Sequence, residues 1–331
     1  MVRSPLKKKV VITDYIEPDL NWESEEFARR GVEFEYHQLK FAPNEKVIEA
    51  TKDADVVVVN MVKITADIVA GWNKTKLVIR HGVGYDNLDL DALEKAGIAP
   101  CYIPDYCAEE VAEQAIALIM ACGRRVVSSR KVLEDSSARG LWDFASMIPI
   151  FRMGGQTLGI LGCGRIGSLV YKKLASFGFR FLITDPYLTE ERKRELGIET
   201  VDKETMFRGS DFVTIHTPLS SETRHIVNST TLAMMKPTAY LVNTARGPMV
   251  DSDALADALK RGVIAGAAID VFDREPPPVE YPLFGLPNAV LSPHLAWYSE
   301  DAAWTIRKLI VLEVDRFLAG QPPRYVAKKS N

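Results

Sequence analysis

Short hydrophobic runs alternate with longer amphipathic stretches along the whole chain, and this alternation predicts an α/β fold. In the second half, apolar runs typical of strands occupy residues 157–162, 180–185, 211–217, 239–245, 266–272 and 289–294. The clearest helical pattern between them covers 252–261, where Asp251 or Ser252 can act as N-cap and Gly262 as the stop. Strands that alternate with helices of this length predict a doubly wound parallel sheet.

The first hundred residues repeat this alternation on a smaller scale. Strand-like runs lie at 8–13, 34–39, 54–60, 77–82 and 97–104. No glycine turn of the phosphate-binding type follows the early strands, and Gly82 and Gly84 come only after the fourth. We therefore expect a second, separate α/β domain. Long helices are predicted at 106–125 and 297–319, at the two points where the chain passes between the domains. The chain would therefore leave the first domain, form the whole of the other domain and then return to the first.

Length and composition narrow the class of protein. A chain of 331 residues favours two domains, and 47% hydrophobic with 26% charged residues is ordinary for a globular protein. The net charge of −3 provides no basic surface for nucleic acid. The apolar runs are too short for a signal peptide or a membrane span. The four cysteines have no metal-like spacing, which indicates reduced thiols in the cytoplasm and no metal site.

A glycine motif follows the strand predicted at 157–162. Gly162, Gly164 and Gly167 have the spacing G-x-G-x-x-G between a strand and a helix. The first glycine permits a tight turn, the second lets the backbone approach a pyrophosphate, and the third lets helix pack on strand. The pyrophosphate would bind the N–H groups of Arg165 and Ile166, where the helix dipole favours an anion.

An acidic residue ends the next predicted strand. Asp185 lies 18 residues beyond the last glycine of the motif, a position from which a carboxylate accepts hydrogen bonds from a ribose diol. The same charge repels a 2′-phosphate, so NADH is expected to be preferred over NADPH. The alternative is that Asp185 only ends the strand before Pro186.

Three further polar residues follow predicted strands, at the edge where open α/β sheets bind ligands. Taken singly, Arg246 is explained as a surface charge, Glu275 as a loop carboxylate and His294 as a buried histidine. Together they match the reduction of a 2-oxo acid. A guanidinium clamps carboxylate and carbonyl oxygens, a histidine donates the proton, and a neighbouring carboxylate favours the imidazolium form.

Several motifs carry a resemblance to a known family: "HGVGYDNLD", "GILGCGRIG", "LVNTARG", "GAAIDVF", "REPPP" and "SPHLAWYSE". With these, the chain resembles the D-isomer-specific 2-hydroxyacid dehydrogenases over nearly its whole length. The catalytic Arg, Glu and His of that family correspond to Arg246, Glu275 and His294 here. Within the family, "HLAWYSE", "DPYL" and "YCAEEVAEQ" are most similar to the C-terminal-binding-protein-like branch.

The resemblance implies a Rossmann-type NAD domain at 105–294, inserted in a flavodoxin-like substrate domain at 1–104 and 295–331. It implies a homodimer with an arm near 128–150, and a small 2-oxo or 2-hydroxy acid as substrate. The expected cofactor contacts include the glycine motif with Arg165 and Ile166, and Asp185, Thr217, Pro218, Thr223, Thr244, Ala245, Arg246, Asp270 and His294. The expected substrate contacts are Val83, Gly84, Arg246, His294 and Trp297.

Two alternatives to a 2-oxo acid reductase stay open. One is a protein that binds dinucleotide and recruits partners. The presence of all three catalytic residues argues against a protein that only binds, without excluding a double role. The other keeps the fold and oxidises formate or phosphite; formate enzymes of this superfamily usually pair the histidine with Gln, so Glu275 argues against formate. Among the histidines, His81 is the one rival to His294 for the role of proton donor.

Overall fold

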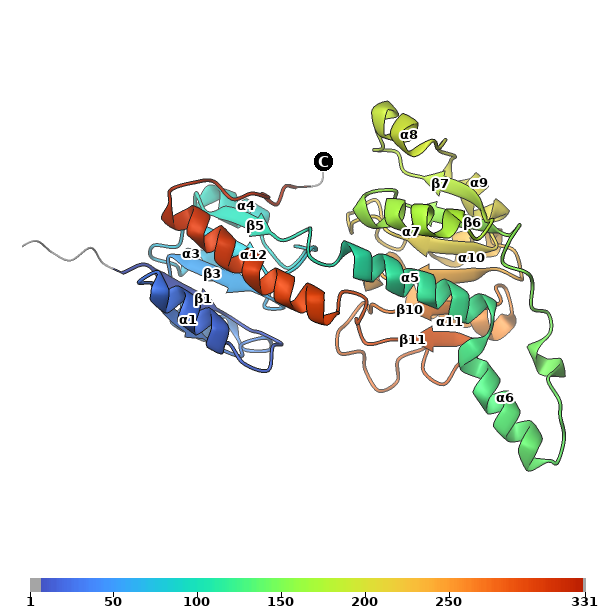
Figure 1. The fold of residues 1–331 in the computed structure, drawn as a ribbon. Coiled ribbons are helices and arrows are strands. Elements are labelled where there is room, and N and C mark those ends of the chain that lie inside the picture. The colour runs from blue at the N-terminus through green and yellow to red at the C-terminus, as the bar shows by residue number, and fades with distance from the viewer. Residues whose placement is uncertain (1–6, 330–331) are drawn as a thin grey trace, which may run out of the picture. The chain divides into compact units, whose positions relative to one another are not determined.

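The computed structural model describes residues 7–329, and these form two compact units (Figure 1). Described residues up to Cys107 and from Ser299 onward make one unit, and Ala108–Tyr298 make the other. Both divisions fall a few residues later along the chain than the expected ones, because α5 (Ala108–Gly123) and the turn after His294 pack with the second unit. The expected substrate domain also includes residues 1–6 and 330–331, which lie outside the described residues.

The first unit is built on a five-stranded parallel sheet. Its strands are β1 (Lys9–Ile12), β2 (Glu33–Tyr36), β3 (Val56–Val59), β4 (Leu77–Arg80) and β5 (Ala99–Tyr102), in the order β2-β1-β3-β4-β5. This is the flavodoxin-like order, in which the chain changes direction between β1 and β3. All four valines of β3 are fully buried, as a central parallel strand requires.

Helices cover both faces of this first sheet. One hydrophobic core forms under α1 (Asn21–Arg29) and α12 (Glu300–Leu318), and a second core forms under α2 (Asn44–Thr51), α3 (Ala66–Ala70) and α4 (Leu90–Lys95). The carboxyl edge of the sheet is left to the loops that follow the strands.

The second unit contains a six-stranded parallel sheet. Its strands are β6 (Thr157–Leu161), β7 (Arg180–Thr184), β8 (Phe212–Ile215), β9 (Tyr240–Asn243), β10 (Gly266–Ile269) and β11 (Ala289–Leu291), in the order β11-β10-β9-β8-β6-β7. Thr200 pairs with Ile183 of β7 through a single parallel bridge. It occupies the outer side of β7, where the third strand of a Rossmann fold would lie. The predicted pair of doubly wound parallel sheets is confirmed.

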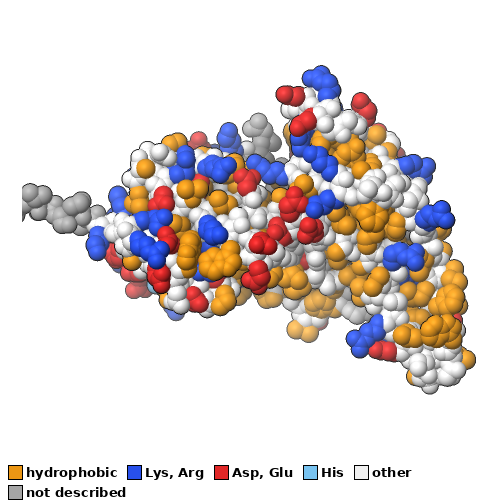
Figure 2. All heavy atoms as spheres, in the orientation of Figure 1, with side chains coloured by type: hydrophobic (Ala, Val, Ile, Leu, Met, Phe, Trp, Pro, Cys, Tyr) orange, Lys and Arg blue, Asp and Glu red, His pale blue; other side chains and the backbone are white. Residues whose placement is uncertain are grey.

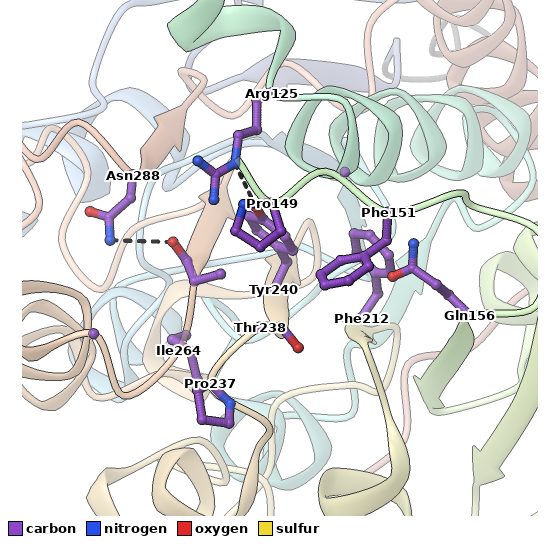
Figure 3. A pocket seen from close by; sticks show the side chains of 13 residues that line it. Arg125, Pro149, Phe151, Gln156, Phe212, Pro237, Thr238, Tyr240, Ile264 and Asn288 are labelled. Carbon is purple, nitrogen blue, oxygen red and sulfur yellow. Dashed lines mark hydrogen bonds between the residues drawn. The ribbon is translucent and has the colours of Figure 1, made fainter. Parts of the chain in front are cut away.

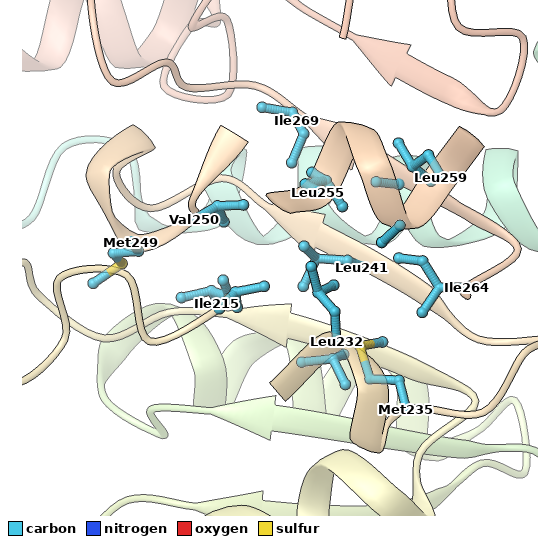
Figure 4. Packing of buried hydrophobic residues seen from close by; sticks show 14 of the residues in the cluster. Ile215, Leu232, Met235, Leu241, Met249, Val250, Leu255, Leu259, Ile264 and Ile269 are labelled. Carbon is cyan, nitrogen blue, oxygen red and sulfur yellow. The ribbon is translucent and has the colours of Figure 1, made fainter. Parts of the chain in front are cut away.

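The helices of the second unit form two layers on its sheet. One face packs against α5 and α7 (Arg165–Ala175). The opposite core contains side chains of α9 (Lys203–Gly209), α10 (Ser229–Met234) and α11 (Ser252–Arg261), with Leu232, Leu255 and Leu259 among its buried members (Figure 4). The remaining helical segments of this unit are α6 (Val126–Ala138), α8 (Glu190–Leu196) and the short 3₁₀ turns η1 (Ala145–Met147) and η2 (Gly247–Met249).

Local signals predicted the elements well and their ends less well. Asp251 is the N-cap of α11, since its carboxylate accepts from Ala254 N at 3.0 Å, and Gly262 ends the helix with φ +68°. The predicted helix at 297–319 begins later, because Ser299 caps α12 through Ala302 N at 2.9 Å. The predicted strands are also too long: residues 216–217, 244–245 and 270–272 leave the sheet and form the loops at its carboxyl edge.

The segment after α5 stands apart from the layered body of the second unit. It contains α6 (Val126–Ala138) and η1, and α6 projects away from the sheet (Figure 1). Figure 2 shows hydrophobic side chains gathered on this part of the surface. The exposed members are Val126, Val127, Leu133, Leu141, Trp142, Phe144, Ile148, Ile150 and Phe151.

Candidate active site

The glycine motif forms the turn between β6 and α7, and its three glycines meet different surroundings. A Cβ atom on Gly162, where φ is +91°, would lie 2.7 Å from Thr217 N, so the turn after β6 and the loop after β8 approach too closely there for a side chain. A Cβ on Gly167 would lie 2.1 Å from the carbonyl oxygen of Gly162. Nothing lies within 4 Å of a Cβ on Gly164. The turn is therefore tight on the protein side and open where a pyrophosphate would bind.

Asp185 braces this turn. Its Oδ2 accepts from Cys163 N at 2.8 Å, and its Oδ1 accepts from Tyr187 N at 3.0 Å. A carboxylate has about four acceptor positions, so these bonds leave capacity for a ribose diol. The Tyr187 hydroxyl in turn donates to Glu222 Oε2 at 2.8 Å. The half-buried Asp185 therefore holds the backbone of the glycine turn in addition to ending the strand.

The loop after β8 holds three of the expected cofactor residues. Thr223 closes it, since its hydroxyl accepts from Ser220 N at 2.7 Å and donates to Pro218 O at 2.8 Å. Burial lowers the pKa of His216, immediately before Thr217, to about 3. His216 therefore stays neutral, with its Nε2 2.9 Å from Thr214 Oγ1.

The loop after β9 carries Thr244, Ala245 and Arg246. The Asn243 side chain spans it, donating to Arg246 O at 2.9 Å and accepting from Ala245 N at 3.0 Å. Among the described residues, the buried hydroxyl of Thr244 has no hydrogen-bond partner. An unsatisfied buried hydroxyl, together with the open turn at Gly164, fits a dinucleotide lying along this edge of the sheet.

His294 and Glu275 form a close pair at the carboxyl edge of the same sheet. Nδ1 of His294 lies 2.8 Å from Oε2 and 3.0 Å from Oε1 of Glu275. Burial alone would raise the pKa of Glu275. The hydrogen bond and charge of His294 outweigh burial, with smaller contributions from Phe272 N–H and Arg246, so the pKa of Glu275 is lowered. The carboxylate orients the ring through Nδ1 and directs Nε2 away from itself.

Asp270 holds the backbone that presents His294. His294 has the unusual φ of +54°, and its N–H donates to Asp270 O at 2.7 Å. The fully buried Asp270 carboxylate accepts from Leu295 N at 3.0 Å and from Ala296 N at 2.9 Å, and it also accepts from the Ser292 hydroxyl. Asp270 was expected at the cofactor, and this structural role has no signal in the sequence, because two of its partners are backbone N–H groups and the third, Ser292, lies 22 residues away.

A family model described as D-isomer specific 2-hydroxyacid dehydrogenase, NAD binding domain, matches residues 116–296. The chain belongs to the D-isomer specific 2-hydroxyacid dehydrogenase family. It is 39% identical to the glyoxylate reductase of Korarchaeum cryptofilum over 86% of each chain. The predicted family is thus confirmed, while closeness to the C-terminal-binding-protein-like branch stays a prediction.

Solved structures support the same assignment. A D-lactate dehydrogenase from Aquifex aeolicus, complexed with NAD and lactic acid, is similar with a TM-score of 0.83 and 29% identity, covering 94% of this chain and 96% of that one. An acyclic imino acid reductase in complex with NADPH and D-Arg has a TM-score of 0.85 and 26% identity, covering 97% of this chain and all of that one. The protein is therefore an NAD-dependent D-2-hydroxyacid dehydrogenase.

The expected substrate residues of the dehydrogenase belong to both units. Val83 and Gly84 lie in the loop after β4 of the first unit, whereas Arg246, His294 and Trp297 belong to the second. Within residues 7–329, the N–H groups of Val83 and Gly84 make no hydrogen bond, which leaves them available to an anion. Trp297 packs edge-on against Tyr298, with 5.2 Å between the ring centroids.

A cavity of about 210 Å³ lies at the opposite, amino-terminal edge of the second sheet (Figure 3). It is lined mainly by apolar and aromatic side chains, including Pro149, Phe151, Phe212 and Tyr240, with Arg125 donating to Tyr240 Oη at 3.3 Å. The predicted site residues do not line it. The expected dinucleotide site is a separate place, at the open turn after β6 and the loops after β7, β8 and β9.

No helix among residues 7–329 has the length and apolar character needed to cross a bilayer. Residues 7–329 also contain no group of three or more His, Cys, Asp or Glu side chains placed to hold a metal ion. Burial raises the pKa of the Cys163 thiol, inside the glycine motif, to about 11, so this cysteine is a poor nucleophile.

Proposed function

We propose that this dehydrogenase reduces a small 2-oxo acid, such as glyoxylate or hydroxypyruvate, to the D-2-hydroxy acid with NADH. The observation that carries the proposal is the His294–Glu275 pair at the carboxyl edge of the NAD-binding sheet, beside Arg246. The relative from Korarchaeum cryptofilum is named a glyoxylate reductase, which supports a small substrate.

Each residue of this set has a separate task. His294 donates a proton from Nε2 to the carbonyl oxygen, since Nδ1 is engaged by Glu275. Glu275 holds the ring and stabilises its charged form. Arg246 binds the carboxylate and polarises the carbonyl through its paired donors. When bound, NADH supplies the hydride that reduces the carbonyl carbon.

The residues expected to hold the cofactor fit a dinucleotide without a 2′-phosphate. Asp185 would bind the ribose diol, and its negative charge opposes the 2′-phosphate of NADPH. Arg165 and Ile166 would offer N–H groups of the first turn of α7 to the pyrophosphate. We therefore propose a preference for NADH, although the similar imino acid reductase was solved with NADPH.

The dehydrogenase is proposed to work as a homodimer joined through the arm near 128–150. Monomeric proteins rarely leave a continuous apolar patch of this kind in water. Trp142 at 84% exposure and Phe144 at 62% are the largest exposed rings of the arm, and a second copy placed on a two-fold axis would bury both arms at once.

An NADH-oxidation assay over 2-oxo acids of increasing side-chain size tests the reaction. We expect the parent to reduce the smaller acids, and His294→Ala to lose roughly 10²–10⁴ in turnover while still binding NADH. Formate and phosphite belong in the same screen, run with NAD⁺. Reduction of NAD⁺ by either anion without 2-oxo acid turnover would replace the proposed reaction, and NADH binding without any turnover would favour a partner-recruiting protein.

A further inference from the structure

A second histidine–carboxylate pair lies at the carboxyl edge of the other sheet. Nε2 of His81 is 3.0 Å from Oε1 of Glu17, and the two side chains are only 10% and 8% exposed. His81 follows β4 directly, and Glu17 lies in the loop between β1 and α1. The pair therefore ties together two loops that are far apart in the sequence.

Glu17 is held as a charged group despite its burial. Burial would raise its pKa, but the hydrogen bond and charge of His81, with the N–H of Ile16, lower the pKa to about 2. A second buried pair stands near it: Arg307 binds both oxygens of Glu23, at 2.5 and 2.6 Å. Arg307 also donates to Asp19 O at 3.4 Å, in the same loop as Glu17. The β1–α1 loop is thus a firm anchor for His81.

The segment that follows His81 is the expected substrate loop. The His81 N–H donates to Val59 O at 2.7 Å, and Ile103 N donates to Gly82 O at 3.1 Å. The Arg80 guanidinium donates to His81 O and lies against Gly82, whose φ of +148° suits glycine. These contacts fix the start of the loop, and the His81 side chain adds the link to Glu17. The backbone N–H groups of Val83 and Gly84 come next in the chain, so their orientation depends on the position of His81 and Gly82.

The two histidine pairs differ in access. The His294 and Glu275 side chains are 34% and 21% exposed, whereas the His81 pair is almost enclosed. A proton donor must reach its substrate, and a ring buried against a carboxylate is better suited to holding a loop.

We infer that His81 is a positioning residue: through Glu17 it holds residues 82–84 in the geometry that binds the substrate carboxylate. This inference rests on the proposed function, since it assigns a purpose to the loop within that reaction. Residues 82–84 would contact the substrate carboxylate and not the reacting carbonyl, so loosening the loop will weaken substrate binding more than proton transfer.

The test compares His81→Leu with His81→Gln. Leucine removes the donor, while glutamine places an amide N–H near the position of the ring Nε2. We expect His81→Leu to raise the KM for the 2-oxo acid roughly ten- to hundredfold while kcat changes by less than about threefold. His81→Gln should recover most of the parent KM. A double variant, His81→Leu with Glu17→Leu, covers the case in which the lone buried carboxylate prevents folding.

A second readout follows the loop itself, independent of turnover. Hydrogen–deuterium exchange of the peptide covering 81–85 should be faster in His81→Leu and in the double variant than in the parent. His37→Leu is the matched control, because His37 Nε2 is 3.8 Å from Glu35 Oε2 in the same unit and has no place in the loop. It should change neither KM nor exchange at 81–85.

The outcomes separate the two proposals. Unchanged KM and unchanged exchange in His81→Leu would overturn the inference, and so would a loss of kcat at constant KM, which would place His81 in the chemistry. If the parent reduces no 2-oxo acid, the proposed function fails, and faster exchange at 81–85 in the variants still supports the link.

Discussion

The ring of His294 is bound to the carboxylate of Glu275 by one nitrogen, Nδ1, at 2.8 Å from Oε2. Glu275 also accepts from Phe272 N at 3.1 Å, so the carboxylate itself is fixed by the backbone. The backbone of His294 is held in turn by Asp270. Both ends of the histidine are therefore set by neighbours, which orients Nε2 for proton transfer.

Glu275→Gln will slow reduction. The variant loses the charged acceptor that holds the His294 ring through Nδ1, so kcat/KM should fall. The loss at the optimum should be smaller than for His294→Ala, because the amide oxygen can still accept from Nδ1. Rates measured from pH 5 to 9 decide this, and superimposable profiles would contradict the role given to Glu275.

Asp185→Ser will narrow the preference for NADH. The serine removes the charge that opposes a 2′-phosphate and keeps a small polar group, so activity with NADPH should rise relative to NADH. The comparison is the ratio of kcat/KM for the two cofactors in parent and variant. A parent that uses both equally well would show that Asp185 does not select the cofactor.

Gly164→Ala will weaken cofactor binding, whereas Gly167→Ala will lower the stability of the fold. A methyl group on Gly164 meets open space, so the variant should fold with the parent melting temperature and bind NADH more weakly. A methyl group on Gly167 would lie 2.1 Å from Gly162 O, so that variant should lose stability. Thermal unfolding and NADH fluorescence titration separate the two effects. Equal melting temperatures for both variants would show that α7 can move away from the turn.

Trp142→Asp will weaken the homodimer. A charge at the most exposed ring of the arm opposes burial against a second copy, so sedimentation velocity should show a shift toward monomer at micromolar concentration. Phe41→Asp is the control, since Phe41 is 74% exposed and lies outside the arm. A parent that already sediments as a monomer would contradict the proposed homodimer.

Glu17 will make stability depend on pH in acid. Its pKa is about 2 in the folded protein against 4.5 ordinarily, so its contribution is complete above about 4.5 and is lost as the pH falls toward 2. The shift corresponds to about 3 kcal/mol of unfolding free energy. Urea unfolding between pH 3 and 6 should therefore change less steeply for Glu17→Gln than for the parent. Exposed Glu25→Gln serves as the control, and an unaltered slope in Glu17→Gln would contradict the prediction.

Signals within a few neighbouring residues determined much of this protein from the sequence alone. The alternation of apolar runs and amphipathic stretches predicted both parallel sheets, and the cap at Asp251 with the stop at Gly262 set one helix. The glycine motif and the polar residues after β7, β9 and β11 indicated a dinucleotide site with a histidine acid. These signals are readable because periodicity, capping and tight turns depend on local geometry.

Only the tertiary structure decided which of these residues support one another. The buried Asp270 holds the turn of His294, Asp185 braces the glycine turn through Cys163 N, and Glu17 anchors His81. The partners in these contacts are separated by tens of residues, and several are backbone groups that every residue possesses. Side-chain type and spacing carry no record of such contacts, because folding brings the groups together through the sheet order and the close approach of loops at its edge.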